Sequence, residues 1–274
     1  MFKQEKDLEK LKICIMVAEI KEIRFRKTLS ARGLNRILNN SNKNDLWVLR
    51  EITGLNEKQK LIKLRHEHYQ ERGVTEHQSK EDPFDDYARF FVLIGKEGNK
   101  EYVSKSLRAI NKENPLGKLP LELNTMNSRQ LNEFNPKSSW TESTLDFRER
   151  ENIANLLNKY QPLDKIYELG GLCGIDPSLI SPLVLMLGVI QVGYEEGWNL
   201  VFHTQHPRHI RGYETIGLPY KRVGGSNFQS GNGEGYLDYC ERPAITLALE
   251  RDEFRKVYEK TFKEATKKIL RIEK

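Results

Sequence analysis

Cysteine is scarce in this sequence, and its placement indicates neither a covalent nor a metal-bound framework. The chain of 274 residues has three, Cys14, Cys173 and Cys240, whose spacing matches neither a set of disulfides nor a zinc knuckle. No run of about 18 apolar residues occurs, and a membrane-spanning helix requires one. The first residues, Met1 to Asp7, lack the apolar core of a secretory signal. Together these absences predict a cytoplasmic protein with no membrane span.

Basic and acidic residues are both abundant, and the basic residues are in excess. Lysine and arginine number 45 against 39 aspartates and glutamates, which gives a net charge of +6. This balance is compatible with an acidic protein, a nucleic acid or an anionic lipid as a partner, and equally with a solvated surface that has none. The sequence has no recognition helix and no RNA-binding motif, so we predict no nucleic-acid partner.

The two ends of the chain are predicted to be helical. Residues 6–38 repeat apolar side chains at close to a 3.6-residue period, and the polar stretch 39–44 is typical of a linker. We therefore predict an N-terminal helical extension over 1–44 and a main domain over 45–251. The charged stretch 252–274 is predicted to form a C-terminal helix.

Strand and helix patterns alternate through the main domain. Strands are predicted at 47–52, 87–94, 101–110, 166–175, 199–204, 220–223 and 244–249, and helices at 56–73, 141–160, 181–196 and 207–216. Ser181 and Pro182 are expected to begin the third of these helices as its cap and first residue. A helical insertion is expected at about 113–163. The order ends in β-α-β-α-β, which predicts an α/β (α+β) fold with a mixed, partly parallel, twisted sheet flanked by helices.

One carboxylate stands in an otherwise apolar strand, beside two glycines. Glu168 precedes Gly170 and Gly171 within the stretch 166–175. A buried carboxyl is a candidate for proton transfer, whereas a Glu that faces solvent or pairs with an arginine is structural. Paired glycines in a strand favour a β-bulge that separates the strand from its neighbour, or else close packing of a helix.

Four stretches resemble one known superfamily. They are Leu64 to Gly73, with Arg65 and Tyr69; Asp82 to Asp85; Tyr167 to Leu172; and His206 to Gly217, which contains His-Pro-Arg-His. In this order they resemble the GNAT acyltransferase superfamily, and within it the long-chain N-acyl amino acid synthases and the acyl-homoserine-lactone (autoinducer) synthases. The resemblance covers about 47–249 and implies a GNAT-like fold.

The resemblance also implies catalytic roles in amide formation from a thioester and an amine. Glu168 would be the base, acting directly or through a water. The backbone N–H groups of Gly171, Leu172 and Cys173 would face the carbonyl oxygen as negative charge develops on it. A bulge at the glycines would let the pantetheine arm of the donor lie between two strands.

Charged residues elsewhere match the acceptor side of autoinducer synthases. Arg65, Asp82, Asp85 and Arg108 resemble the charged cluster that shapes the acceptor site in that family. Arg108 ends an otherwise apolar strand, so it is expected to pair with an acid. A structural ion pair without a role in substrate binding is the alternative.

The resemblance departs from the family at two places. The family's arginine after the glutamate is Gly171 here, and 176–182 has neither the glycines nor the basic residue that bind coenzyme A phosphates. An acidic acyl carrier protein would therefore be the favoured donor, attracted by the net positive charge. The residues expected to contact the carrier or cofactor are Ser178, Ser181, His206, Arg208 and Arg211.

The sequence also offers residues for two other chemistries. His203, His206 and His209 are spaced three apart, but the family match explains the last two without a metal, and we predict no metal site. Cys173 is a conceivable nucleophile, but no histidine is placed beside it by the sequence.

The predicted function is N-acyl transfer. A long-chain fatty acyl group would pass from acyl carrier protein or acyl-CoA, as an acyl-phosphopantetheine donor, to the amine of an amino acid or similar small molecule, with no permanently bound cofactor. The acyl chain would lie among apolar residues that serve equally well as core: Leu183, Val184, Leu187, Ile190 and Val201. Two alternatives stay open: an acetyl-CoA-dependent GNAT N-acetyltransferase, and a GNAT-fold binding module that has lost catalysis.

Overall fold

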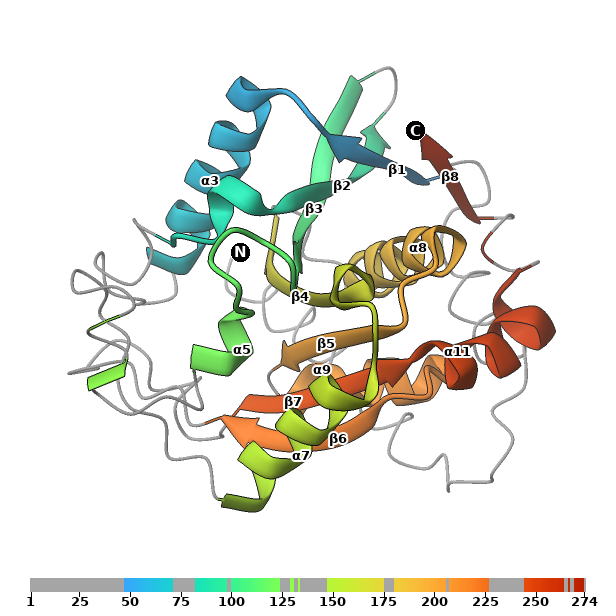
Figure 1. Cartoon of the computed structure of the whole chain (residues 1–274). Coiled ribbons are helices and arrows are strands. Elements are labelled where there is room, and N and C mark those ends of the chain that lie inside the picture. The colour runs from blue at the N-terminus through green and yellow to red at the C-terminus, as the bar shows by residue number, and fades with distance from the viewer. Residues whose placement is uncertain are drawn as a thin grey trace, which may run out of the picture. The chain divides into compact units, whose positions relative to one another are not determined.

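The described part of the chain is built around one mixed sheet, shown by a computed structural model (Figure 1). The structure describes residues 47–70, 82–97, 100–123, 129–130, 133, 147–174, 180–205, 207–226, 244–263, 266 and 269–273. All of them belong to one compact unit, Ala31–Lys274. The predicted N-terminal helix over residues 6–38 lies outside the described residues.

Eight strands form the sheet, in the order β6-β7-β5-β4-β3-β2-β1-β8. Their bounds are β1 Trp47–Ile52, β2 Arg89–Glu97, β3 Lys100–Asn111, β4 Ile166–Cys173, β5 Leu200–Gln205, β6 Lys221–Ser226, β7 Ala244–Glu250 and β8 Leu270–Glu273. The pairs β4–β5 and β1–β8 are parallel, and the other neighbours are antiparallel. The prediction of a mixed, partly parallel sheet is therefore confirmed.

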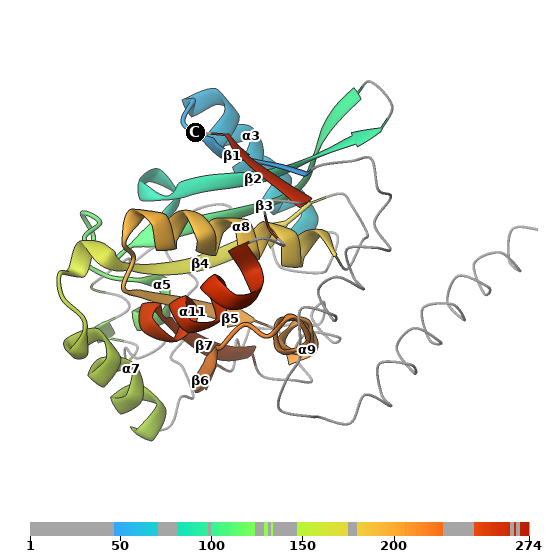
Figure 2. The ribbon, with the colours of Figure 1, turned by 90° about the vertical axis from the view of Figure 1, so that its right-hand side faces the viewer.

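Helices cover both faces of this sheet. Their bounds are α3 Leu55–Gln70, α5 Pro120–Leu123, α7 Phe147–Lys159, α8 Ser181–Glu196, α9 Pro207–Ile216 and α11 Arg251–Val257, which continues as a π-helix over Tyr258–Phe262. Helices α3 and α7 lie near opposite ends of the sheet, and α8 lies across it on the side of α9 and α11 (Figures 1 and 2). None of the helices in the described ranges has both the length and the apolar character that crossing a bilayer requires.

Alternating side chains of the strands create two apolar layers. Leu49 and Phe91 pack against α8, α9 and α11, whereas Val48 and Phe90 pack against α3, α5 and α7. Successive residues of a strand point to opposite faces, so one strand supplies both layers. The central strands are accordingly apolar on both sides.

Helix α8 is the crossover that joins the parallel strands β4 and β5. A Cβ built on Gly188 would lie 2.6 Å from Leu270 Cδ2, so the glycine lets α8 lie directly against β8. The helix stops at Gly197, as the sequence predicted, and Gly197 has a left-handed conformation (φ +81°). The predicted cap is wrong: Ile180 precedes the helix and makes no side-chain cap, while Ser181 is fully buried inside the first turn.

The C-terminal end differs from its prediction. A single helix was expected over 252–274, but the chain returns to the sheet as β8, parallel to β1. Leu270 is buried against α8, and Glu273 accepts a hydrogen bond of 2.8 Å from Arg50 Nε on β1. The alternation of Leu270 and Ile272 with charged residues suits a strand, but the many lysines nearby concealed it.

Candidate active site

The parallel strands β4 and β5 separate part-way along their length. Their ladder joins residues 166–169 of β4 to residues 200–203 of β5 and ends at the pair Leu169 and His203. Beyond this pair, β4 continues to Cys173 alongside β3, whereas β5 continues to Gln205 alongside β7. The separation that the paired glycines predicted is therefore confirmed.

A β-bulge accompanies the separation. The register between β3 and β4 shifts between Ser106 and Arg108. On β4, Gly171 has a φ of +65°, a conformation that glycine adopts without steric cost. A Cβ built there would lie 3.2 Å from Arg65 Cδ and 3.4 Å from Arg108 Cγ. Because position 171 has no side chain, two arginines can lie against the bulge, and a side chain there would crowd them.

Replacing Gly171 by alanine is expected to lower the free energy of unfolding by about 1–2 kcal/mol, because the left-handed backbone is strained for any residue with a Cβ. Gly170→Ala is the matched control, since a Cβ there has no neighbour within 4 Å and its φ is not positive. It is expected to change stability by less than about 0.5 kcal/mol. Urea unfolding of both variants measures the difference, and equal effects would contradict the bulge geometry.

Glu168 lies on β4 one pair before the ladder ends, and it is only 6% exposed. The backbone N–H of Leu121 donates a hydrogen bond of 2.7 Å to its Oε2. Burial raises the pKa of the Glu168 carboxyl to about 8; the Leu121 bond and the charge of Arg108 lower it, while the charges of Glu122 and Asp82 raise it. The carboxyl is therefore mostly protonated at neutral pH, and it becomes a proton acceptor above about pH 8.

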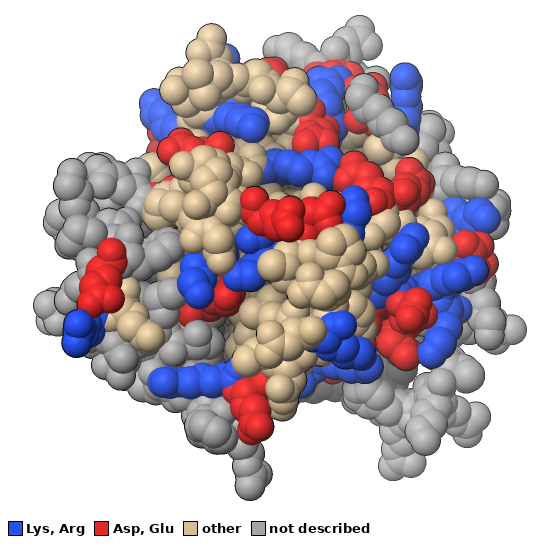
Figure 3. All heavy atoms as spheres, in the orientation of Figure 1, with Lys and Arg blue, Asp and Glu red and all other residues tan. Residues whose placement is uncertain are grey.

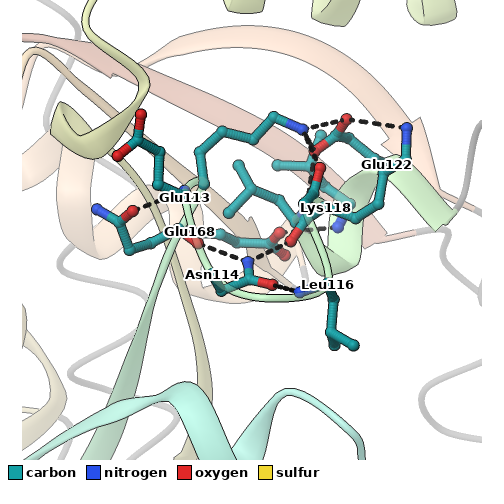
Figure 4. Close-up of polar contacts among 11 residues, drawn as sticks. Glu113, Asn114, Leu116, Lys118, Glu122 and Glu168 are labelled. Carbon is teal, nitrogen blue, oxygen red and sulfur yellow. Dashed lines mark hydrogen bonds and ion pairs between the residues drawn. The ribbon is translucent and has the colours of Figure 1, made fainter.

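The segment that covers Glu168, residues 111–123, is held by its own polar contacts (Figure 4). Lys112 Nζ lies 2.8 and 2.7 Å from the two carboxylate oxygens of Glu122. Glu122 in turn accepts a hydrogen bond of 2.7 Å from the backbone N–H of Leu119. These contacts keep the N–H of Leu121 directed at Glu168. Leu121 and Glu122 could not be predicted from the sequence, because Leu121 acts through its backbone and Glu122 lies in a segment whose path no periodicity encodes.

The four charged residues predicted for the acceptor side come together beside the bulge. Arg65 Nη1 donates to Asp85 Oδ1 at 2.7 Å, and its Nη2 contacts Asp85 Oδ2. Arg108 donates at 2.5 Å both to Asp85 and to Asp82. All but Asp82 are almost wholly buried. The sequence thus predicted their proximity correctly, while their role in substrate binding stays a prediction.

The charges in this cluster stabilise one another. Burial by itself would raise the pKa of Asp85, but the hydrogen bond from Arg65 and the charges of both arginines hold it below its usual range. Burial likewise opposes the charge on Arg108, yet the neighbouring Asp82 and Asp85 raise the pKa of its guanidinium. Asp85 and Arg108 are therefore ionised at neutral pH, in contrast to Glu168.

The remaining residues predicted on β4 line the same stretch. Cys173 is buried, and its Sγ lies 3.0 Å from Ser106 Oγ on β3. Leu172 packs against the apolar layer that contains α8. Both follow the point at which β4 leaves β5, as the predicted oxyanion role of their N–H groups requires.

Of the five residues predicted to contact the carrier or cofactor, only Ser181 has a side chain that the structure describes. Ser178 and His206 lie outside the described residues, and the side chains of Arg208 and Arg211 on α9 are not described. Ser181 is fully buried, so its side chain does not reach the surface. The predicted acyl-chain residues lie in the apolar layer of α8: Val184, Leu187, Ile190 and Val201 are buried, and Leu183 packs beside them.

No family model and no curated protein sequence matches the chain. Its structure is similar to that of FeeM, an N-acyl amino acid synthase from uncultured soil microbes, with 16% identity and a TM-score of 0.51 over 80% of this chain and 97% of that one. It is also similar to the AHL synthase LasI (13% identity, TM-score 0.49, 85% and 100% coverage) and to BjaI, a CoA-dependent acyl-homoserine lactone synthase (12%, 0.47, 84% and 94%). The likeness to FeeM shows the fold, and the predicted α/β fold with a mixed sheet is confirmed.

Proposed function

We propose that this protein is an N-acyltransferase that moves a fatty acyl group from a phosphopantetheine thioester to the amine of an amino acid or a similar small molecule. One observation carries the proposal. A buried carboxyl, Glu168, whose pKa is raised to about 8, lies one pair before two parallel strands separate. The fold is similar to that of FeeM, an N-acyl amino acid synthase, and a buried carboxyl beside a gap between strands suits amide formation.

The chemistry assigns each group a task. The amine nitrogen attacks the thioester carbonyl, the new C–N bond forms, the C–S bond breaks, and the leaving thiolate takes up the proton that Glu168 has accepted from the amine. The Glu168 carboxylate takes the proton that the amine loses, and a water relays it because the carboxyl is covered by 119–123. The N–H groups of Gly171, Leu172 and Cys173 hold the carbonyl oxygen as it becomes negative.

The charged cluster supplies a candidate anchor for the amine substrate. The Nε–H of Arg108 is buried and has no hydrogen-bond partner among the residues that the structure describes, although its other nitrogens bind Asp82 and Asp85. A buried donor without a partner costs about 1–3 kcal/mol, and a carboxylate is the acceptor that a guanidinium binds best. We therefore assign to Arg108 the binding of the acceptor's carboxylate, with Arg65 and the two aspartates holding it in place.

The donor is proposed to be acyl carrier protein or acyl-CoA. The net charge of +6 favours an acidic carrier protein. On the face shown in Figure 3, however, basic and acidic side chains of the described residues are interspersed and do not form separate regions. The carrier is therefore proposed from net charge and from the phosphate-binding residues that 176–182 lacks, and a cytoplasmic location is proposed with it.

A product screen tests the proposal. Purified protein is incubated with long-chain acyl carrier protein, long-chain acyl-CoA or acetyl-CoA and a panel of amino acids, and products are identified by mass spectrometry. N-acyl amino acids formed from a long-chain donor support the proposal. Acetylated amines alone would show an acetyl-CoA-dependent N-acetyltransferase, and absence of product with every donor would favour a binding module.

A further inference from the structure

A cavity of about 340 Å³ lies between helix α7 and the strands β6 and β7. Helix α7 packs against β6 near one edge of the sheet (Figure 1). The cavity is on the same face of the sheet as Glu168 but two strands away, because Glu168 pairs with Phe202 of β5, and Phe202 pairs with Ala248 at the cavity. Phe202 is fully buried between them. The cavity is therefore separate from the candidate active site.

Helix α7 presents mostly polar side chains to this cavity. Asn152, Asn155, Leu156 and Lys159 all line it, and their spacing of three and four residues places them on one face of the helix. A helix face that packs closely on a sheet is normally apolar, whereas three of these four residues are polar. The volume is at the lower end of the range of roughly 300–1,000 Å³ that is common for small-molecule sites. This face of α7 therefore suits a small polar ligand.

A buried carboxylate holds two lysines at the cavity. Glu250, the last residue of β7, is 7% exposed, and its two oxygens accept hydrogen bonds of 2.6 Å from Lys159 Nζ and 2.5 Å from Lys221 Nζ. The Tyr160 hydroxyl also donates to it. Burial by itself would raise the pKa of Glu250, but these hydrogen bonds lower it to about 2. The ionised Glu250 therefore keeps an ammonium group of α7 and one of β6 close together.

The charges that line the cavity favour an anion. Three basic residues, Lys159, Lys221 and Arg222, and one acidic residue, Glu250, leave two positive charges in excess. Each lysine ammonium has three N–H donors, so the bond to Glu250 does not exhaust them. The side chains of Lys159 and Lys221 are 59% and 56% exposed, so a ligand can reach them from solvent.

We propose that this cavity binds a small phosphate monoester, with the phosphate group between Lys159 and Lys221. A phosphate monoester has close to two negative charges at neutral pH and three strong acceptor oxygens, which match the excess charge and the available donors. The carboxamides of Asn152 and Asn155 provide further donors. Three apolar residues of the lining can contact the organic part of such a ligand: Leu156, Val223 and Ala248.

Ligand-observed NMR at low salt tests the proposal with three probes. Phenyl phosphate has the proposed chemistry, benzenesulfonate has the same ring and a tetrahedral anion with a single charge, and inorganic phosphate has no organic part. Line broadening of each probe is followed as the wild-type protein is added. We expect phenyl phosphate to bind with a dissociation constant on the order of 1 mM, and about fivefold more tightly than either of the other probes.

Two variants localise the binding. Replacing both Lys159 and Lys221 by glutamine is expected to weaken phenyl phosphate binding about tenfold or more, because both ammonium groups are lost. Since this change also removes partners of Glu250, Asn155→Asp is the second variant. It keeps both lysines, adds a negative charge to the cavity, and is expected to weaken binding about tenfold. Circular dichroism checks that both variants are folded.

Lys63→Gln is the matched control, because it removes one positive charge from an exposed ion pair with Glu67 on α3. It is expected to bind phenyl phosphate as tightly as the wild type.

Phenyl phosphate that shows no broadening at millimolar concentrations would overturn the inference, as would binding that both cavity variants leave unchanged. Equal affinity for benzenesulfonate would contradict a site for a dianion. Equal affinity for inorganic phosphate would show a site for the free ion and contradict the monoester. The measurement involves no turnover, so none of these outcomes bears on the proposed acyl transfer.

Discussion

Glutamine at position 168 is expected to lower kcat/KM for acyl transfer by roughly 10²- to 10⁴-fold, the usual contribution of a general base. The fold should survive, since the amide oxygen of glutamine can still accept the hydrogen bond from the N–H of Leu121. The measurement is steady-state transfer from a long-chain donor, alongside the circular dichroism of both proteins. Full activity in Glu168→Gln would remove Glu168 as the base.

The pH dependence of the transfer rate and of stability provides a second test of Glu168. Because the pKa of Glu168 is raised to about 8, the rate is expected to increase with pH up to that value, as the carboxylate forms. Stability should change in the opposite sense. The folded protein holds a proton that the unfolded chain has released, so the folded state loses stability as pH rises from about 4.5 to about 8.

For Glu168 alone this loss amounts to at most about 5 kcal/mol, and it should stop above pH 8. Other groups titrate in the same range, so the difference between wild type and Glu168→Gln is the informative quantity. That difference should shift in favour of the variant as pH rises from 5 to 8, as measured by urea unfolding at each pH. A difference that does not vary with pH would show that Glu168 is not buried as described.

Replacing Asp85 by asparagine is expected to lower the free energy of unfolding by about 3–5 kcal/mol, the usual effect of breaking a buried ion pair from one side. The change would leave Arg65 without this carboxylate and Arg108 with Asp82 alone. For a chain of this size, such a loss lowers the melting temperature by on the order of 10 °C. Scanning calorimetry measures it.

The neighbouring Asp86 offers a control, because it is exposed while Asp85 is buried. Asp86→Asn should change stability by less than about 0.5 kcal/mol. The pKa of Asp85 is held below its usual value near 3.8, so the stability it provides is present above that pH and is lost as the pH falls below it. The difference between Asp85→Asn and the wild type should therefore shrink in acid, and similar effects of the two variants would contradict the buried cluster.

Much of the fold could be predicted because its signals are local. Strand β1 has the predicted bounds, and α8 ends at Gly197, where a glycine terminates an apolar run. The charged cluster was also anticipated, since an arginine in an apolar strand needs an acid and the resemblance supplied Asp82 and Asp85.

What could not be predicted depends on contacts between distant parts of the chain. Strand β8 exists because β1 offers it an edge, and Arg50 and Glu273 on these strands are 223 residues apart. Leu121 acts through a backbone N–H, which has no residue signature.

Because the ladder between β4 and β5 is short, few backbone hydrogen bonds join the two halves of the sheet. One half contains β8, β1, β2, β3 and β4, and the other contains β5, β7 and β6. In the sheet they pair only through the residue pairs from 166–200 to 169–203. A ligand that binds in the gap beyond this ladder would contact both halves of the sheet. It would bind only the folded protein, and it would therefore stabilise the folded state by mass action. The melting temperature would then show whether a donor is bound, so a donor could be identified by the rise it causes before any product is known.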